Sequence, residues 1–256
     1  MSDIAIEFKN VTKSYSISRH KYRRISDDIS LAFKKVLTKE NRSLVDEKFL
    51  ALKKVSFKVE QGVNLGIIGK NGAGKSTILK LISKITYPDY GEITVNGKIG
   101  AFIELGAGLH PELSGRENIY LYGAILGMRK KEVDEKFRDI VNFSELEKFL
   151  DTPIKRYSSG MYARLGFSVV SFMNPDILLI DEVLAVGDKN FQEKCLQKME
   201  EFAKGSKSIV FISHNLEAVR KLCTRVILLD QGTIVAEGNP EKVINIYTSK
   251  YANKTL

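Results

Sequence analysis

Short runs of apolar and β-branched residues alternate along the chain with longer stretches of helical periodicity. The runs that predict strands are residues 4–8, 51–59, 64–69, 92–100 (two short strands), 176–181, 207–213 and 225–238 (a hairpin turned by Gln231-Gly232). The stretches that predict helices are residues 75–86, 117–127, 130–143, 188–205 and 240–251. Strands that alternate with helices are typical of an α/β protein with a largely parallel sheet. Two helical stretches follow each other without a strand, which predicts a helical block between Glu117 and Phe149.

Composition is ordinary for a globular protein: of 256 residues, 43% are hydrophobic and 28% charged, enough for one large or two modest domains. No apolar run approaches the ~18 residues of a membrane helix, and the N-terminus lacks the pattern of a signal peptide, so we expect a cytosolic chain. The two cysteines, Cys195 and Cys223, lie in helical patterns and suit reduced, buried thiols better than a disulfide.

The net charge of +9 changes this picture, because it leaves nucleic acid, an anionic membrane surface and a nucleotide open as partners. More than half of the excess lies between Tyr15 and Lys39, where seven basic residues stand against two acidic ones. In the same segment, apolar residues recur at helical spacing on one face: Tyr22, Ile25, Ile29, Ala32, Phe33 and Val36. Such a basic, amphipathic helix favours an anionic membrane surface, and a peripheral packing helix is the alternative.

The stretch GKNGAGKST, residues 69–77, matches the phosphate-binding pattern G-x-x-x-x-G-K-[ST] between a predicted strand and a predicted helix. Glycines let the backbone curl so that successive N–H groups surround a phosphate chain. A lysine then neutralises the outer phosphates, and a hydroxyl ligates Mg²⁺. The residues predicted to bind the nucleotide here are Gly69, Asn71, Gly72, Gly74, Lys75, Ser76 and Thr77, with Ser76 also predicted as a metal ligand.

Polar side chains follow two further buried strands. Asp181 ends the run DILLID and is predicted to hold Mg²⁺ through water, and Glu182 beside it is the candidate general base for hydrolysis. His214 ends the run KSIVFISH, where it could contact the γ-phosphate as a second catalytic residue.

The stretch RYSSGMYARLGFSV, residues 156–169, begins a helix with two serines and a glycine. Such a start exposes unpaired N–H groups and the positive end of the helix dipole. It can therefore cap itself or hold an anion, and the residues alone leave both readings open.

Together GKNGAGKST, YSSGM, ILLIDE, VLAVGD and ISH resemble, in order and spacing, the ATP-binding subunits of ABC transporters. The resemblance implies a P-loop NTPase fold with an antiparallel β subdomain and a helical subdomain, binding ATP and Mg²⁺. It further implies that YSSGM is the signature motif, which contacts the γ-phosphate held by the other copy in a homodimer. The residues it adds to the nucleotide site are Tyr15, which matches the aromatic that stacks on adenine, Ser158, Ser159, Gly160 and Asp188.

In more detail, ELGAGLHPELSGRENI and LIDEVLAVGD look like the ATPases that export O-antigen, teichoic acid and related lipid-linked polysaccharides. That resemblance implies a single ABC ATPase domain over residues 1–256, with an amphipathic insertion (gate helix) at 16–49, a helical subdomain at about 105–173 and a short C-terminal helix at 239–256. It implies a transmembrane permease dimer as partner, an undecaprenyl-linked polysaccharide as substrate and a peripheral place on the cytoplasmic face of the plasma membrane. No nucleic acid and no C-terminal sugar-binding domain are expected.

Two departures separate this chain from the general ABC pattern. No glutamine lies between Gln61 and Gln192, so Glu104 or Leu105 stands where most such ATPases carry a glutamine that contacts Mg²⁺. YSSGM replaces LSGGQ and keeps its serine and second glycine. An ABC ATPase for another transported substrate and a soluble ABC ATPase acting on nucleic acid remain the alternative functions.

Overall fold

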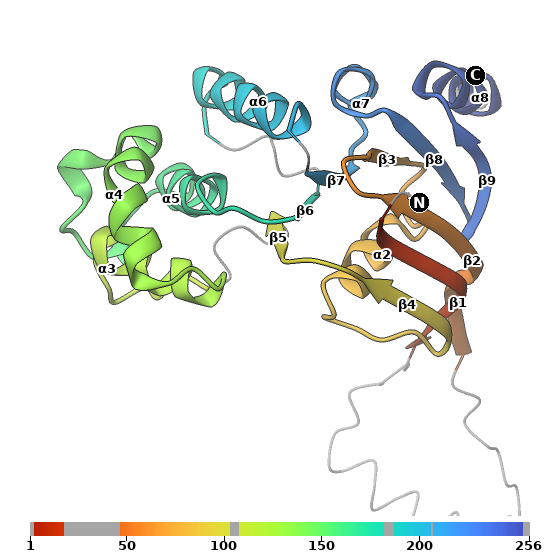
Figure 1. The fold of residues 1–256 in the computed structure, drawn as a ribbon, viewed down its shortest axis with the longest axis horizontal. Coiled ribbons are helices and arrows are strands. Elements are labelled where there is room, and N and C mark those ends of the chain that lie inside the picture. Colours follow the sequence, from red (N-terminus) through yellow and green to blue (C-terminus); the bar gives the residue numbers. More distant parts are fainter. Residues whose placement is uncertain (1–2, 18–46, 103–107, 182–186, 206, 253–256) are drawn as a thin grey trace, which may run out of the picture.

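The computed structural model describes residues 3–17, 47–102, 108–181, 187–205 and 207–252. Figure 1 shows two lobes: a body that holds the strands, and a helical lobe that joins the body through the chain around β5 (Ile99–Phe102) and β6 (Ile177–Ile180). The phosphate-binding stretch lies in the body and YSSGM lies in the helical lobe.

Three strands form an antiparallel sheet in the order β2-β1-β4, and they are β1 (Ile4–Ile17), β2 (Glu47–Glu60) and β4 (Tyr90–Val95). The first two strands are longer than their apolar runs predicted. β1 continues through Ile17 and β2 begins at Glu47 because the strands stay in register there, with Tyr15 opposite Phe49. The predicted gate-helix insertion at 16–49 therefore begins and ends in strand, and its centre, residues 18–46, lies outside the described residues.

Six strands form the second sheet in the order β5-β6-β7-β3-β8-β9, and they are β3 (Asn64–Ile68), β5 (Ile99–Phe102), β6 (Ile177–Ile180), β7 (Ser208–Ile212), β8 (Arg225–Asp230) and β9 (Thr233–Gly238). All neighbours are parallel except β8 and β9, which form the predicted hairpin. Every residue of β3, β6 and β7 is buried, as expected for central parallel strands covered on both faces. The largely parallel sheet predicted from the alternation of strands and helices is confirmed.

The helices of the body are α2 (Lys75–Ile82), α6 (Lys189–Ala203), α7 (Leu216–Leu222) and α8 (Pro240–Ala252). The helical lobe contains α3 (Gly115–Ile125), α4 (Lys130–Ser144), α5 (Ser159–Ser171) and two short 3-10 turns, Glu147–Phe149 and Ile154–Arg156. A helical block is present where the sequence predicts one.

The large sheet separates two apolar cores. One core packs the antiparallel sheet and α2 against one face of the strands, with Phe8, Ile78 and Leu179 among its members. The other lies on the opposite face and continues into the helical lobe, where the rings of Phe102 and Phe167 lie 4.7 Å apart. Helix α5, which begins within the stretch YSSGM, packs into this second core. The helical lobe is therefore packed against the sheet that carries the phosphate-binding loop.

Candidate functional site

The loop after β3 adopts a backbone that only glycine accommodates at two positions. Gly69 has φ +151°, and a Cβ built there would lie 2.1 Å from the carbonyl oxygen of Leu229. Gly74 has φ +107°, and its Cβ would lie 2.5 Å from the carbonyl oxygen of Ala51. These positions bring the loop against its neighbours, so the glycines at both ends of the motif are required by the fold as well as by a phosphate.

Helix α2 begins directly after this loop with no side-chain cap at Gly74, so the first N–H groups of the helix are not covered by a capping side chain. Lys75 is the first residue of the helix and is 7% exposed. Its ammonium group donates to the carbonyl oxygens of Gly69, at 2.7 Å, and Lys70, at 3.0 Å. The charge is thereby held inside the loop, where a phosphate chain is expected.

A cleft of about 230 Å³ opens beside the loop and brings together residues from five parts of the chain. The predicted site residues that line it are Tyr15, Asn71, Gly72, Gly74, Lys75, Ser76, Thr77, Asp181 and His214. The residues that the sequence did not single out are Phe49, Ala51 and Ile212. Gly69 lies at the base of the loop and is buried.

Sheet topology explains this assembly. The strands that end at the loop, at Asp181 and just before His214 are β3, β6 and β7, which are neighbours in parallel register. The carboxyl ends of parallel strands meet at one edge of a sheet, which is where α/β proteins bind ligands. The pairing of β6 with β7 and of β7 with β3 thus brings the phosphate loop next to Asp181 and His214, which lie more than a hundred residues later in the chain.

The cleft offers hard oxygen ligands of the kind that Mg²⁺ prefers. The hydroxyl of Ser76 and the carboxylate of Asp181 line the same space, next to the ammonium group of Lys75. This donor set fits the magnesium ion that accompanies a nucleotide in P-loop proteins.

Two aromatic side chains stand at the mouth of the cleft. Tyr15 is 39% exposed, and Phe49, its cross-strand neighbour, is 48% exposed. The ammonium group of Lys13 lies 5.5 Å from the centre of the Tyr15 ring. Exposed rings beside a phosphate loop suit stacking on a flat base. Phe49 was missed because the apolar run FLAL reads as core, and only its pairing with Tyr15 reveals its place.

A second pocket, of about 680 Å³, lies at the start of α5, and we call the two the signature pocket and the signature helix. This pocket shares none of its described lining residues with the cleft. The predicted site residues that line it are Ser158, Ser159, Gly160 and Asp188. The hydroxyl of Ser158 accepts a hydrogen bond from the N–H of Met161 at 3.2 Å, so it caps α5 in this chain. The capping reading of this helix start is therefore confirmed for Ser158. The exposed hydroxyl of Ser159 and the backbone of Gly160 remain open to a ligand.

Gly160 differs from the glycines of the phosphate loop. A Cβ built there would meet only the hydroxyl oxygen of Ser158, at 3.8 Å, and its φ is not in the left-handed region. The fold of a single chain thus does not require a glycine at this position. A close approach by something outside the chain does explain it.

Arg164 links the signature helix to the segment that carries Asp188. Its guanidinium donates to the carboxylate of Glu145 at 2.8 Å and forms an ion pair with Asp188. The group also lies 4.7 Å from the centre of the Phe191 ring. Asp188 in turn caps α6 by accepting from the N–H of Phe191 at 3.0 Å, and this bond is the main reason why its pKa is lowered.

Sequence reasoning missed Arg164 because a lone arginine on a helix usually faces solvent. The position of Arg164 could have indicated this role, because it lies one and a half helical turns after Ser158 and Ser159, on the face of α5 that meets α6. Three other predicted positions, Glu182 and the pair Glu104 and Leu105, lie outside the described residues.

Comparison with known proteins agrees with this geometry. The ABC transporter family profile matches residues 52–185, which include the phosphate loop, the signature stretch and Asp181. The chain belongs to the ABC transporter family. Two relatives indicate the branch: the O-antigen export system ATP-binding protein RfbB of Klebsiella pneumoniae is 45% identical over 96% of this chain and 98% of the relative. The teichoic acids export ATP-binding protein TagH of Enterococcus faecalis is 42% identical over 96% of this chain and 52% of the relative.

Solved ABC cassettes have the same fold as this ABC ATPase. A dimeric ATP-binding cassette in a post-hydrolysis state, bound to ADP and Pi, superposes with a TM-score of 0.70 at 23% identity, covering 92% of this chain and 98% of that one. An ATP-binding subunit of an ABC transporter superposes with a TM-score of 0.73 at 21% identity, over 95% and 93% of the two chains. The predicted ABC-type fold is therefore confirmed. Among the described residues of the ABC ATPase, no helix has the length and apolar content to span a bilayer.

Proposed function

We propose that this chain is the ATP-hydrolysing subunit of a transporter that exports a lipid-linked polysaccharide of the O-antigen or teichoic acid type across the cytoplasmic membrane, from the cytoplasmic face. The observation that carries the proposal is the 45% identity to an O-antigen export protein over nearly the full length of both chains. A relative from a teichoic acid export system at 42% identity supports the same class of cargo, and an undecaprenyl-linked glycan is the form we propose.

The active unit is a homodimer in which each ATP is bound by two chains. The phosphate loop and the signature pocket are lined by different residues in one chain, and the space at Gly160 suits the close approach of a second chain's nucleotide. In a two-fold dimer the contact is reciprocal, so two sites form together. Ser158, Ser159 and Gly160 then complete the site that the partner's phosphate loop begins.

The predicted site residues have separate tasks in hydrolysis. Lys75 neutralises the β- and γ-phosphates, and Tyr15 with Phe49 holds the adenine ring. Ser76 and Asp181 would hold Mg²⁺, which would neutralise charge on the phosphate oxygens. Glu182 accepts a proton from the attacking water, and His214 donates a hydrogen bond to the γ-phosphate.

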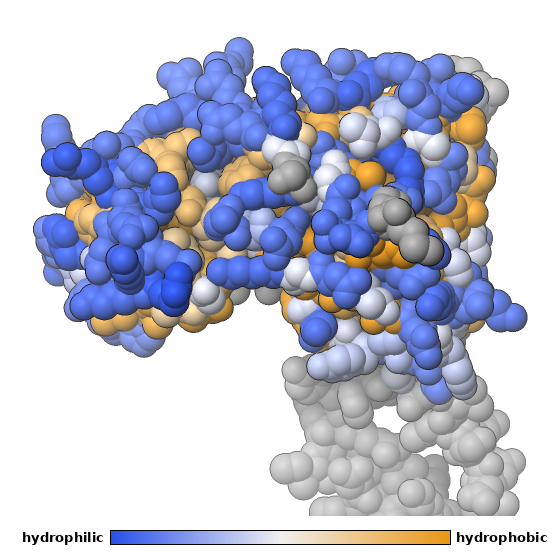
Figure 2. Space-filling model, viewed as in Figure 1, coloured by the Kyte–Doolittle hydropathy of each residue, from blue (hydrophilic) through white to orange (hydrophobic). Residues whose placement is uncertain are grey.

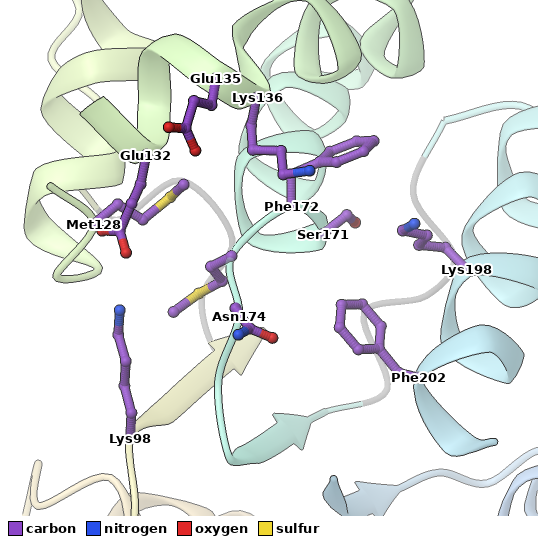
Figure 3. A pocket seen from close by; sticks show the side chains of 11 residues that line it. Lys98, Met128, Glu132, Glu135, Lys136, Ser171, Phe172, Asn174, Lys198 and Phe202 are labelled. Carbon is purple, nitrogen blue, oxygen red and sulfur yellow. The ribbon is translucent and has the colours of Figure 1, made fainter. Parts of the chain in front are cut away.

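The permease that the proposal requires has a suitable docking place between the lobes. A pocket of about 600 Å³ lies between α4, the end of α5, α6 and the start of β5, and Figure 3 shows its side chains. Met128, Met173 and Phe202 form an apolar lining. Because α4 and α5 of the helical lobe and α6 of the body all line it, a permease segment seated here would respond to any change in the relative position of lobe and body.

The permease contact can be tested by a cysteine cross-link. Both native cysteines are buried, and burial raises the pKa of each thiol to about 12, so neither competes for a surface reagent. Lys136→Cys places one reactive thiol at the rim of the pocket shown in Figure 3. We expect it to cross-link to the permease in membranes, while Lys242→Cys, exposed on α8, serves as the control that does not.

The shared nucleotide site can be tested by mixing two inactive variants. Lys75→Ala removes the phosphate lysine, and Gly160→Asp adds a carboxylate where the γ-phosphate approaches without a clash inside the chain. In a mixed dimer one site carries both lesions and the other carries none. If half of the dimers are mixed, about a quarter of all sites are intact, and ATPase activity returns to that order. No recovery on mixing contradicts the shared site.

The cargo can be tested in the cell that makes this protein. Deleting the chain should abolish surface polysaccharide while the lipid-linked precursor accumulates inside. A Lys75→Ala chain should fail to restore export, and the unaltered chain should restore it. Normal surface polysaccharide in the deletion strain would exclude this cargo and leave the ATPase assignment standing.

A further inference from the structure

The turn formed by residues 84–90, which follows α2 and includes the first residue of β4, displays an unusual set of side chains. Ile85, Tyr87 and Tyr90 are 60%, 69% and 75% exposed, and they are the three most exposed large hydrophobic residues in the described part of the chain. All three fall within six residues. Single exposed apolar residues are common, but three in one turn are a feature that calls for a partner. The face shown in Figure 2 is mostly hydrophilic, with hydrophobic patches between the hydrophilic groups.

This turn is held in place by hydrogen bonds. The N–H of Ile85 donates to the carbonyl oxygen of Lys80 at 2.9 Å, and the N–H of Asp89 donates to that of Thr12 at 2.9 Å. The carboxylate of Asp89 accepts from both the N–H and the hydroxyl of Ser14, each at 2.6 Å. The exposed rings are therefore presented by an ordered turn that is tied to β1, which lowers the entropy cost of binding.

The turn lies at the end of the antiparallel sheet where the insertion is attached. Tyr90 pairs with Thr12 of β1, five residues before β1 ends at Ile17, and β2 begins at Glu47 opposite Ile17. Figure 1 shows this end of the sheet away from α7 and α8. The sequence between the two strands, residues 18–46, carries eight Lys or Arg against four Asp or Glu. The exposed aromatic side chains thus lie at the end of the sheet where β1 leads into this basic sequence and β2 follows it.

Tyrosine and isoleucine beside a basic segment match the chemistry of a membrane surface. The tyrosine ring is apolar and its hydroxyl is polar, so the side chain favours the boundary between acyl chains and headgroups. Basic segments add attraction to anionic lipids. We propose that the turn 84–90 inserts Ile85, Tyr87 and Tyr90 into the interfacial layer of an anionic bilayer.

This contact fixes which end of the subunit faces the membrane and so deepens the proposed function. The vesicle measurements need neither permease nor glycan, so the membrane contact can fail while the export function stands, and the export function can fail while the membrane contact stands.

The chain contains no tryptophan, which allows a direct measurement. Tyr90→Trp introduces a single fluorophore on the turn, and Ile246→Trp places one on α8, at a side chain that is 44% exposed. Vesicles of phosphatidylglycerol and phosphatidylcholine should shift the emission of Tyr90→Trp to the blue, and brominated acyl chains should quench it. Ile246→Trp should show neither change. An unshifted, unquenched Tyr90→Trp in the presence of bound vesicles overturns the proposal.

Affinity gives the second measurement. Tyr87→Ser combined with Tyr90→Ser should weaken binding to these vesicles by about tenfold, which corresponds to about 1.4 kcal/mol, with ATPase activity unchanged. Val235→Ser combined with Ile246→Ser removes two exposed apolar side chains elsewhere and should leave binding intact. Equal vesicle binding by both double variants overturns the proposal. The proposal is also overturned if Tyr87→Ser combined with Tyr90→Ser binds vesicles normally but no longer copurifies with the permease, because the turn then contacts a protein.

Discussion

Replacing Arg164 by methionine tests whether the signature helix is positioned from inside the chain. Methionine keeps most of the volume of the side chain and removes the guanidinium that bridges Glu145 and Asp188. Arg164 itself is only 16% exposed, while the two carboxylates are 47% and 59% exposed. Water therefore screens both pairs, and the pair with Glu145 contributes about 0.5–1 kcal/mol. Contact with the Phe191 ring adds about 0.5–1 kcal/mol.

The expected loss of unfolding free energy is about 1–2 kcal/mol. Glu145 keeps a partner in Arg164→Met, since Lys194 donates to it at 2.6 Å, which limits the cost. For a chain of this size the loss corresponds to a decrease in melting temperature of about 2–8 °C, measurable by scanning calorimetry. Turnover should fall more than nucleotide affinity, because the phosphate loop is untouched while the start of α5 loses its link to Asp188.

The matched control is Arg116→Met. Arg116 also forms an ion pair, with Asp151 at 2.7 Å, and also lies over a ring, that of Phe137 at 5.3 Å. It lies in the helical lobe on α3 and does not line the signature pocket. Arg164→Lys should recover part of the stability and little of the turnover, because an ammonium group cannot bridge two carboxylates in the same geometry. Equal melting temperature and turnover in Arg164→Met and Arg116→Met would refute the reasoning.

Four further outcomes are expected. Hydrogen bonds from the Ser14 hydroxyl, Lys13 and the Ser14 N–H lower the pKa of Asp89 from 3.8 to about 2. The ionised Asp89 therefore contributes about 1–2 kcal/mol to the unfolding free energy above pH 4, and this contribution is lost as the pH falls through 2. Urea unfolding of Asp89→Asn should show the same loss already at pH 7. Gly74→Ala should destabilise the fold by about 1–3 kcal/mol through its clash with Ala51, whereas Gly160→Ala should leave the melting temperature unchanged and lower ATPase activity. At pH 8 a maleimide should modify neither Cys195 nor Cys223 until the protein is unfolded, and rapid native labelling would contradict their burial. Glu182→Gln should bind ATP normally and hydrolyse it about 10²–10⁴ times more slowly, and equal hydrolysis under saturating ATP would exclude Glu182 as the base.

Sequence alone predicted the phosphate loop because its chemistry is local. The glycines, Lys75 and Ser76 lie within nine residues, so their spacing already fixes which groups surround a phosphate. The same is true of the strands that carry Asp181 and His214, whose continuous apolar runs indicate burial on both faces.

Only the tertiary structure decided which distant elements meet. Residues 92–100 read as two strands joined by a turn, yet β4 pairs with β1 in one sheet and β5 pairs with β6 in the other. Phe49 joins the nucleotide cleft because the register of β1 and β2 places it opposite Tyr15. Arg164 becomes a link because α5 packs beside the start of α6. The local pattern of residues determines the conformation of a segment and the chemistry that it carries. The pairing and register of strands depend instead on which of many possible long-range partners buries the most apolar surface. That information is spread over the whole chain.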